Sequence, residues 1–252
     1  NFSVSIGINA GASNVTGCNV MIGFSAGCLN TTGGSNVFVG CNAGNFNTTG
    51  GSNSFFGAVS GAKNTVGNSN SFFGGGAGIC NTTGSYNSFF GVASGTGYQS
   101  GNTSGNYNSF FGYYSAICVN GNKNIYIGSR SGWRVTSTAN NKIIIGTGND
   151  GLSFFDAPDP LKSCQLAIGL RDVQYDYGPA KYWIVGNENF NIGIGTTNPK
   201  TKLQVGGVLG FNDTNIKIGV NTDANGVGVN TGTNNFYAGT NAGCSNVNGK
   251  GN

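Results

Sequence analysis

A short repeat runs through most of the sequence, and in each copy a glycine closes a run of three residues. One copy reads Asn53-Ser54-Phe55-Phe56-Gly57, and the next begins at Asn70. The closing glycines are Gly7, Gly23, Gly40, Gly57, Gly74, Gly91, Gly112, Gly128 and Gly146. From Gly23 to Gly91 the spacing is 17 residues, which is too short for a repeat that contains a helix.

This spacing suits one turn of a β-solenoid, in which successive strands stack about 4.8 Å apart. We therefore predict an all-β fold, a repetitive β-solenoid of the β-roll or β-prism kind. The longer step from Gly91 to Gly112 indicates a loop that bulges from an otherwise regular stack.

Two further patterns fill each unit after its short strand. A Gly-x-x-Ala/Ser-Gly segment, such as Gly40-Cys41-Asn42-Ala43-Gly44, predicts close approach of the backbone at a narrow point of the coil. An Asn-Thr-Thr-Gly corner follows at residues 30–33, 47–50 and 81–84. We expect Gly and Asn to supply the positive φ angles that such corners require.

The composition agrees with stacked β-structure. There are 47 Gly and 17 Phe but only 4 Pro, which excludes collagen and a simple disordered chain. Charged residues make up 8% of the chain, so its polarity must be satisfied by backbone and amide hydrogen bonds.

The alternation of side chains along a strand suggests which face is buried. The first and last strand positions exchange Val20 plus Ile22 for Ser54 plus Phe56, which conserves volume and predicts that this face lies inside the coil. From the second copy onward the middle position is large and apolar, and we expect it to face outward into an interface between chains. These predicted oligomer-interface residues are Met21, Phe38, Phe55, Phe72, Phe89, Phe110, Tyr126 and Ile144. The partner would be the chain itself, in an intertwined or side-by-side homotrimer.

The repeat divides the chain into three parts. Residues 1–146 form the repeat β-solenoid shaft, 147–190 a β-rich insertion with strands at 165–169 and 182–186, and 191–252 a junction motif followed by resumed shaft repeats. The chain opens and closes inside repeats, so we take it as a portion of a longer fibre.

Charge and cysteine usage exclude several classes of protein. The net charge is +4, and no basic cluster interleaves with aromatic residues, so we expect no nucleic-acid partner. No run of 18 apolar residues is present, so we expect no membrane insertion. Seven Cys without a Cys-x-x-Cys pair and without His argue against zinc, and Cys28, Cys41 and Cys80 are expected to be small buried residues.

Catalysis is not expected. Nucleophile–base chemistry commonly needs a His, and none is present. The closest carboxylate pairs are Asp172 with Asp176 and Asp156 with Asp159, in loop-like sequence where solvated acids are ordinary. We therefore assign no catalytic residue, no metal site and no cofactor.

The strings Asn-x-Phe-Phe-Gly and Asn-Thr-Thr-Gly resemble the shaft repeats of phage tail-fibre proteins. The stretch from Asn191 to Val205 resembles a junction motif of the same proteins. The repeats are also similar to the β-roll heads of trimeric autotransporter adhesins. These resemblances imply a structural, homotrimeric fibre on a virion or an extracellular surface that attaches to a host.

Two alternatives remain open at this point. A bacterial trimeric surface adhesin would share the architecture. An ice-binding β-solenoid would use Thr32, Thr49 and Thr83, which recur at coil spacing.

The receptor of such a fibre would be a cell-surface glycan or protein. Aromatic residues and Arg dominate binding hot spots, which favours five residues of the middle segment. They are Arg171, Tyr175, Tyr177, Tyr182 and Trp183, although the same residues could simply pack the insertion.

Overall fold

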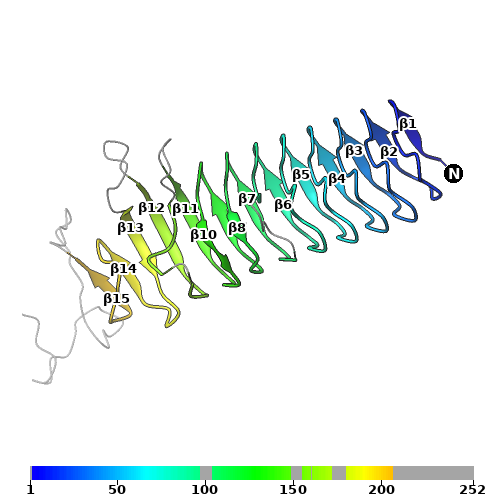
Figure 1. Ribbon diagram of the computed structural model, residues 1–252. Coiled ribbons are helices and arrows are strands. Elements are labelled where there is room, and N and C mark those ends of the chain that lie inside the picture. Colours follow the sequence, from blue (N-terminus) through cyan, green and yellow to red (C-terminus); the bar gives the residue numbers. More distant parts are fainter. Residues whose placement is uncertain (1, 97–103, 149–154, 160, 172–179, 207–252) are drawn as a thin grey trace, which may run out of the picture. The chain divides into compact units, whose positions relative to one another are not determined.

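The computed structural model describes residues 2–96, 104–148, 155–159, 161–171 and 180–206, all within one compact unit. Every regular element in this part of the chain is a β-strand (Figure 1). The repeat region contains β1 (Val4–Ile6), β2 (Val20–Ile22), β3 (Val37–Val39), β4 (Ser54–Phe56), β5 (Ser71–Phe73), β6 (Ser88–Phe90), β7 (Ser109–Phe111), β8 (Ile117–Val119), β9 (Ile125–Ile127), β10 (Trp133–Ser137) and β11 (Ile143–Thr147). Four more strands follow: β12 (Leu166–Arg171), β13 (Ala180–Gly186), β14 (Ile192–Ile194) and β15 (Leu203–Val205).

The strands stack into a β-solenoid, as the repeat predicts. Nine of them, β1 to β7 followed by β9 and β11, pair in parallel with the equivalent strand one turn away. The register is residue on residue, so Phe55 lies over Phe38 and under Phe72. The other sides of each turn are bonded along the same axis, for example from the Gly27 amide to the Ala43 carbonyl at 2.9 Å. A second, two-stranded parallel sheet joins β8 and β10.

The interior of the solenoid is a single column of large side chains from the middle strand positions. Its members are Met21, Phe38, Phe55, Phe72, Phe89, Phe110, Tyr126 and Ile144, each no more than 2% exposed. Neighbouring rings stack with centroids 4.6–5.2 Å apart. The predicted orientation of these residues is therefore wrong: they fill the coil of their own chain, and they cannot meet another chain.

The narrowness of the coil explains this orientation. A Cβ added to Gly61 would lie 2.5 Å from the ring of Phe55, and the φ of Gly61 is +55°. Ala26, Ala43 and Ala77 on the same segment are fully buried. The Gly-x-x-Ala/Ser-Gly segment thus makes the predicted close approach, and each turn has room for one bulky side chain. This limit on space explains why the middle position carries one large side chain in turn after turn.

Two columns of asparagine form hydrogen bonds with polar groups inside the solenoid. In the first, the Asn47 amide donates to Asn30 Oδ1 at 2.6 Å, and Asn64 donates to Asn47 Oδ1 at 2.7 Å. In the second, the backbone amide of each Asn donates to the side chain one turn earlier. This column consists of Asn19, Asn36, Asn53, Asn70, Asn87, Asn108 and Asn124, all fully buried. The amide hydrogen bonds expected from the composition are thus organised as ladders along the axis.

The corners differ from the expectation in one respect. Positive φ falls on Ser35, Ser52 and Tyr86, at 58–60°, and not on the glycine of the Asn-Thr-Thr-Gly string. Glycine is needed there for space, because a Cβ on Gly50 would lie 2.4 Å from the carbonyl oxygen of Gly67 in the next turn.

The strands expected at 165–169 and 182–186 are present as β12 and β13. β12 pairs in parallel with β11, β13 lies antiparallel between β12 and β14, and β15 pairs in parallel with β14. The middle segment therefore continues the same 13-stranded sheet instead of forming a separate one. The repeats expected beyond residue 206 lie outside the described residues.

The cysteines are less buried than expected. Cys41 and Cys18 are exposed, while Cys28, Cys80 and Cys164 are half-buried. Cys18, Cys28, Cys41 and Cys164 carry free thiols. In the described part of the chain, no helix is long and apolar enough to cross a membrane.

Candidate functional site

The first and last strand positions form one continuous exterior surface, which we call the outer face. Strand by strand it consists of Val4 and Ile6, Val20 and Ile22, Val37 and Val39, Ser54 and Phe56, Ser71 and Phe73, Ser88 and Phe90, Ser109 and Phe111, Ile125 and Ile127, Ile143 and Ile145, Leu166 and Ile168, Ile184 and Gly186, Ile192 and Ile194, and Leu203 and Val205. None of these residues carries a charge. Phe90 and Phe111 are 36% and 41% exposed, so a wide apolar strip borders solvent.

The aromatic part of the outer face is ordered. Phe56, Phe73, Phe90 and Phe111 stack in register with centroids 4.8–5.1 Å apart and planes within 7°. Each Phe shares its strand face with a small Ser, whereas the flanking strands carry two medium-sized side chains in the same positions. In the sequence, the replacement of two medium-sized side chains by one small and one large side chain suggested that this face lies inside the coil. The structure places the same face on the exterior.

The predicted receptor residues are not brought together where they are described. Tyr182 is half-buried, and its ring lies 5.4 Å from that of Phe155 against the core. Trp183 is 58% exposed at an irregularity in the β12–β13 pairing, where such a bulge re-aims a side chain. Tyr175, Tyr177 and the side chain of Arg171 lie outside the described residues. Tyr182 thus packs the fold, and Trp183 stands apart from it.

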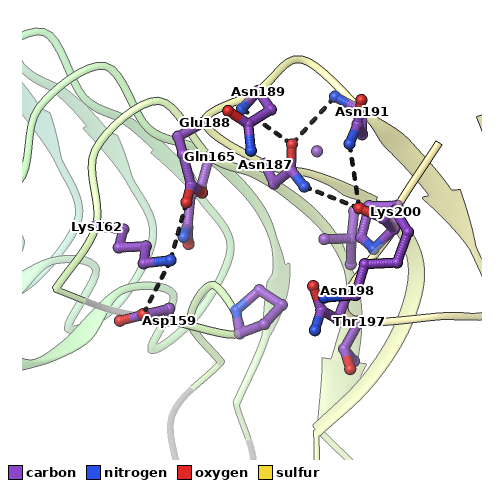
Figure 2. A pocket seen from close by; sticks show the side chains of 14 residues that line it. Asp159, Lys162, Gln165, Asn187, Glu188, Asn189, Asn191, Thr197, Asn198 and Lys200 are labelled. Carbon is purple, nitrogen blue, oxygen red and sulfur yellow. Dashed lines mark hydrogen bonds and ion pairs between the residues drawn. The ribbon is translucent and has the colours of Figure 1, made fainter. Parts of the chain in front are cut away.

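A polar pocket lies between the turn at residues 187–191 and the segment at 197–200 (Figure 2). Its volume is about 550 Å³. The Lys162 ammonium lies 2.8 Å from Glu188 and 3.9 Å from Asp159. Gln165 lies between Lys162 and Asn187 in this view. The lining is thus made of amides, carboxylates and ammonium groups.

The frame of the pocket is fixed by asparagine hydrogen bonds. The side-chain amides of Asn187 and Asn191 donate to the Pro199 carbonyl at 3.1 and 3.2 Å. Asn187 Oδ1 in turn accepts from the backbone amides of Asn189 and Asn191, at 3.0 and 3.1 Å. The turn and the 197–200 segment are therefore tied together before any ligand arrives.

Sequence reasoning missed this pocket. The available signal was the concentration of charge after Asp150, since the repeats before it hold only five charged residues. A loop rich in Asn and in both signs of charge, next to a nearly uncharged shaft, is unusual in this chain.

A second group of titratable residues belongs to the solenoid, with Lys142 and Tyr126 buried and Asp156 half-buried. Lys142, 1% exposed, takes the place of an asparagine in the second ladder, and its backbone amide donates to Asn124 Oδ1 at 3.0 Å. Burial lowers the pKa of the Lys142 ammonium, and Asp156 and Asp159 partly oppose this shift. Burial raises the pKa of the Asp156 carboxyl to about 6, against the effects of Lys142 and of a hydrogen bond from the Ala157 amide. Burial also raises the pKa of Tyr126 well above 10.

Asp156 gives a testable dependence of stability on pH. Its folded pKa of about 6 exceeds the ordinary 3.8, so the folded chain holds this proton more tightly than the unfolded chain. The free energy of unfolding is therefore expected to fall, by on the order of 2 kcal/mol from this group, as the pH rises from about 4 to about 6. Urea unfolding of the wild type and of Asp156→Asn across this range isolates the contribution, with Asp159→Asn as the control. Identical pH profiles for the wild type and Asp156→Asn would contradict it.

The threonines considered for ice binding do not form a continuous strip. Thr32, Thr49 and Thr83 are exposed at equivalent corner positions, but Val66 takes the intervening one. They lie in turns and not on a strand.

Of the two carboxylate pairs considered for catalysis, the structure describes Asp156 with Asp159, and these two differ in environment. Asp156 is half-buried next to the fully buried Phe155 and Asp159 lines the polar pocket, while Asp172 and Asp176 lie outside the described residues. Within the described ranges, no three His, Cys, Asp or Glu side chains gather in a way that could hold a metal ion. Comparison with models of known families, with curated proteins and with solved structures gave no match.

Proposed function

We propose that this chain is a structural segment of a homotrimeric fibre on a virion or an extracellular surface, and that the fibre serves attachment to a host. The observation that carries the proposal is the outer face, an uncharged apolar strip that follows one sheet through thirteen strands. An exposed apolar surface of this extent is typical of an interface.

The size of the outer face supports this role. Thirteen strands stacked about 4.8 Å apart give a strip roughly 60 Å long, and two side chains per strand make it roughly 10 Å wide. The resulting area of roughly 600 Å² is large for the exposed apolar patch of a monomer. It is close to the ~800 Å² that each partner contributes to an interface of ordinary size.

The pattern of side chains on the outer face also favours a packed partner. On a face that contacts only water, the summed side-chain volume of each strand is not restricted. Ser54 with Phe56 and Val37 with Val39 would then have no reason to be similar in total volume. The observed trade of one large ring for two medium side chains is what a close-packed surface tolerates. We infer that the constraint comes from another chain.

A second copy of this chain is the partner that fits best. The strip runs along the stacking axis, so copies placed side by side could match strand for strand. Three copies around a common axis would each turn one strip inward, and closed symmetry leaves no strip uncovered. A bacterial trimeric adhesin would use the same arrangement, so the proposal covers both a virion and a cell surface.

The mass of the native particle tests this proposal. Light scattering of the wild type is expected to give three chains per particle. The double variant Phe73→Lys with Phe90→Lys is expected to be monomeric, because it places charges at the centre of the outer face. Thr49→Lys with Val66→Lys, on an exposed corner, is the matched control and should stay trimeric. A monomeric wild type would overturn the proposal, and a dimer would overturn the three-fold arrangement.

A further inference from the structure

We infer that the polar pocket between residues 187–191 and 197–200 binds an uncharged polyhydroxylated ligand, a short neutral sugar. The inference deepens the attachment role proposed above and rests on it for its biological purpose. The pocket itself is built by one chain, so its binding chemistry can be judged separately from assembly.

The balance of charge in the pocket selects a neutral ligand. Its lining has two carboxylates, Asp159 and Glu188, and two ammonium groups, Lys162 and Lys200. Lys162 is already paired with both carboxylates, at 3.9 and 2.8 Å. With equal numbers of positive and negative groups, the lining offers no excess charge to either an anion or a cation. The lining is also too polar for an apolar ligand.

Gln165 supplies the second, independent observation. Its side chain lines the pocket and is 6% exposed, yet its Oε1 atom accepts no hydrogen bond. A buried acceptor without a donor is costly, and native proteins seldom keep one without a reason. The atom has almost no accessible surface, so a ligand hydroxyl group would supply the missing donor after a small shift of the side chains that cover it. The orphan acceptor therefore points to a ligand that donates hydrogen bonds.

The remaining walls match the same chemistry. Thr197 and Asn198 are exposed at the rim, and Figure 2 shows their side chains beside the space across from Asp159. Hydroxyl and amide groups both donate and accept, as sugar hydroxyl groups do. The lining also includes the half-buried Pro158, whose ring offers apolar surface to the carbon atoms of a sugar.

The pocket is both large enough and prepared for such a ligand. A volume of about 550 Å³ lies within the usual range for small-molecule sites. The hydrogen bonds from Asn187 and Asn191 to Pro199 hold its two walls at a fixed separation. Lys202 adds a third tie, because its ammonium group donates to the Asn189 carbonyl at 2.8 Å. A rigid site loses less entropy when it binds.

The test uses the intact chain and a panel of defined disaccharides. Maltose, lactose and N,N′-diacetylchitobiose are titrated by saturation-transfer NMR, together with a sulfated disaccharide and a short lysine peptide as charged probes. At least one neutral disaccharide is expected to bind, with its signals saturated at the ring protons. No binding of any neutral sugar, or preferential binding of a charged probe, would overturn the inference.

Two variants assign the binding to this pocket. Gln165→Met keeps the size of the side chain but removes the buried acceptor, so it should weaken sugar binding at least tenfold without lowering the thermal midpoint. Asn198→Ala at the rim should weaken binding at least threefold. Thr49→Ala, on an exposed corner of the shaft, is the control and should bind as the wild type does. Unchanged binding in both pocket variants would overturn the inference.

Light scattering on the same samples separates this inference from the fibre proposal. A trimer that binds no neutral sugar would remove the pocket assignment and leave the fibre proposal standing. A monomer that binds sugar through Gln165 would remove the fibre proposal and leave the pocket standing.

Discussion

Replacing Phe72 with alanine is expected to lower the free energy of unfolding by about 4 kcal/mol. Phe72 is fully buried, and its ring stacks on Phe55 at 4.8 Å and on Phe89 at 4.7 Å. Loss of the ring removes the apolar burial, both ring contacts and the packing against Gly78. The neighbouring turns cannot close the gap, because each is fixed by its own ladder of backbone hydrogen bonds. Urea unfolding followed by circular dichroism measures the loss.

The adjacent residue is the matched control. Phe73 lies on the outer face of the same strand and stacks on Phe56 and Phe90, but it is only half-buried in the single chain. Phe73→Ala is expected to lower the free energy of unfolding of the isolated chain by only about 1 kcal/mol. Its main effect is expected to be weaker assembly of the chains. Equal losses of stability, or a larger loss for Phe73→Ala, under conditions where the wild type and both variants are monomeric would show that the assignment of the two faces is wrong.

The strands and their register were predictable because the repeat carries them directly. Each three-residue strand of the main sheet precedes a glycine, and equivalent residues pair turn upon turn, as Phe55 does with Phe72. The repeat alone did not predict which face of each strand points into the coil and which points outward. Alternation shows only that Phe55 and Phe56 point to opposite sides, and both sides are apolar. The decision between them depends on Gly61, whose missing side chain makes room for the ring of Phe55.

The sequence predicted that amide groups would form hydrogen bonds in the stack, but it did not predict where these groups lie in the coil. The excess of Asn predicts amide hydrogen bonds, and the 17-residue spacing of Asn30, Asn47 and Asn64 places them in register. The sequence cannot tell whether such residues point into the coil or out to solvent. Their depth follows from the corner geometry, which turns the side chain toward the Gly carbonyl three residues later.

The candidate pocket depends on contacts that no spacing reveals. It joins residues 158–165 with residues 185–200, and the reversal of direction between β12 and β13 brings these stretches together. The parallel repeat provides no precedent for that antiparallel pairing. Of the expected receptor residues that the structure describes, Tyr182 and Trp183 differ in environment for a related reason, since the irregular pairing beside Trp183 points its side chain away from that of Tyr182.

Replacing Asn64 with aspartate is expected to cost about 4 kcal/mol at pH 7, although the two side chains have nearly the same shape. Asn64 Nδ2 donates to Asn47 Oδ1 at 2.7 Å and to the Gly67 carbonyl at 3.0 Å, in a fully buried site. An aspartate oxygen in its place would face two acceptors and carry a charge. The buried acceptor of Asn47 would lose its donor as well. Urea unfolding at pH 7 and pH 4 measures the effect, which should be smaller at pH 4, where a protonated carboxyl group can donate one bond.

Asn68→Asp makes the same chemical change at an exposed position of the same turn. Asn68 Oδ1 accepts from the Gly51 amide at 2.8 Å, and this bond survives the substitution. Only the bond from Asn68 Nδ2 to the Val66 carbonyl is lost, and water can replace it. We expect a cost of about 1 kcal/mol or less. If Asn64→Asp were as mild as Asn68→Asp, the amide ladder would contribute little to stability, and the columns of asparagine would need another explanation. A large and pH-dependent difference between the two variants would mean that this chain uses buried amide ladders, in place of surface charge, to hold its polar interior in register.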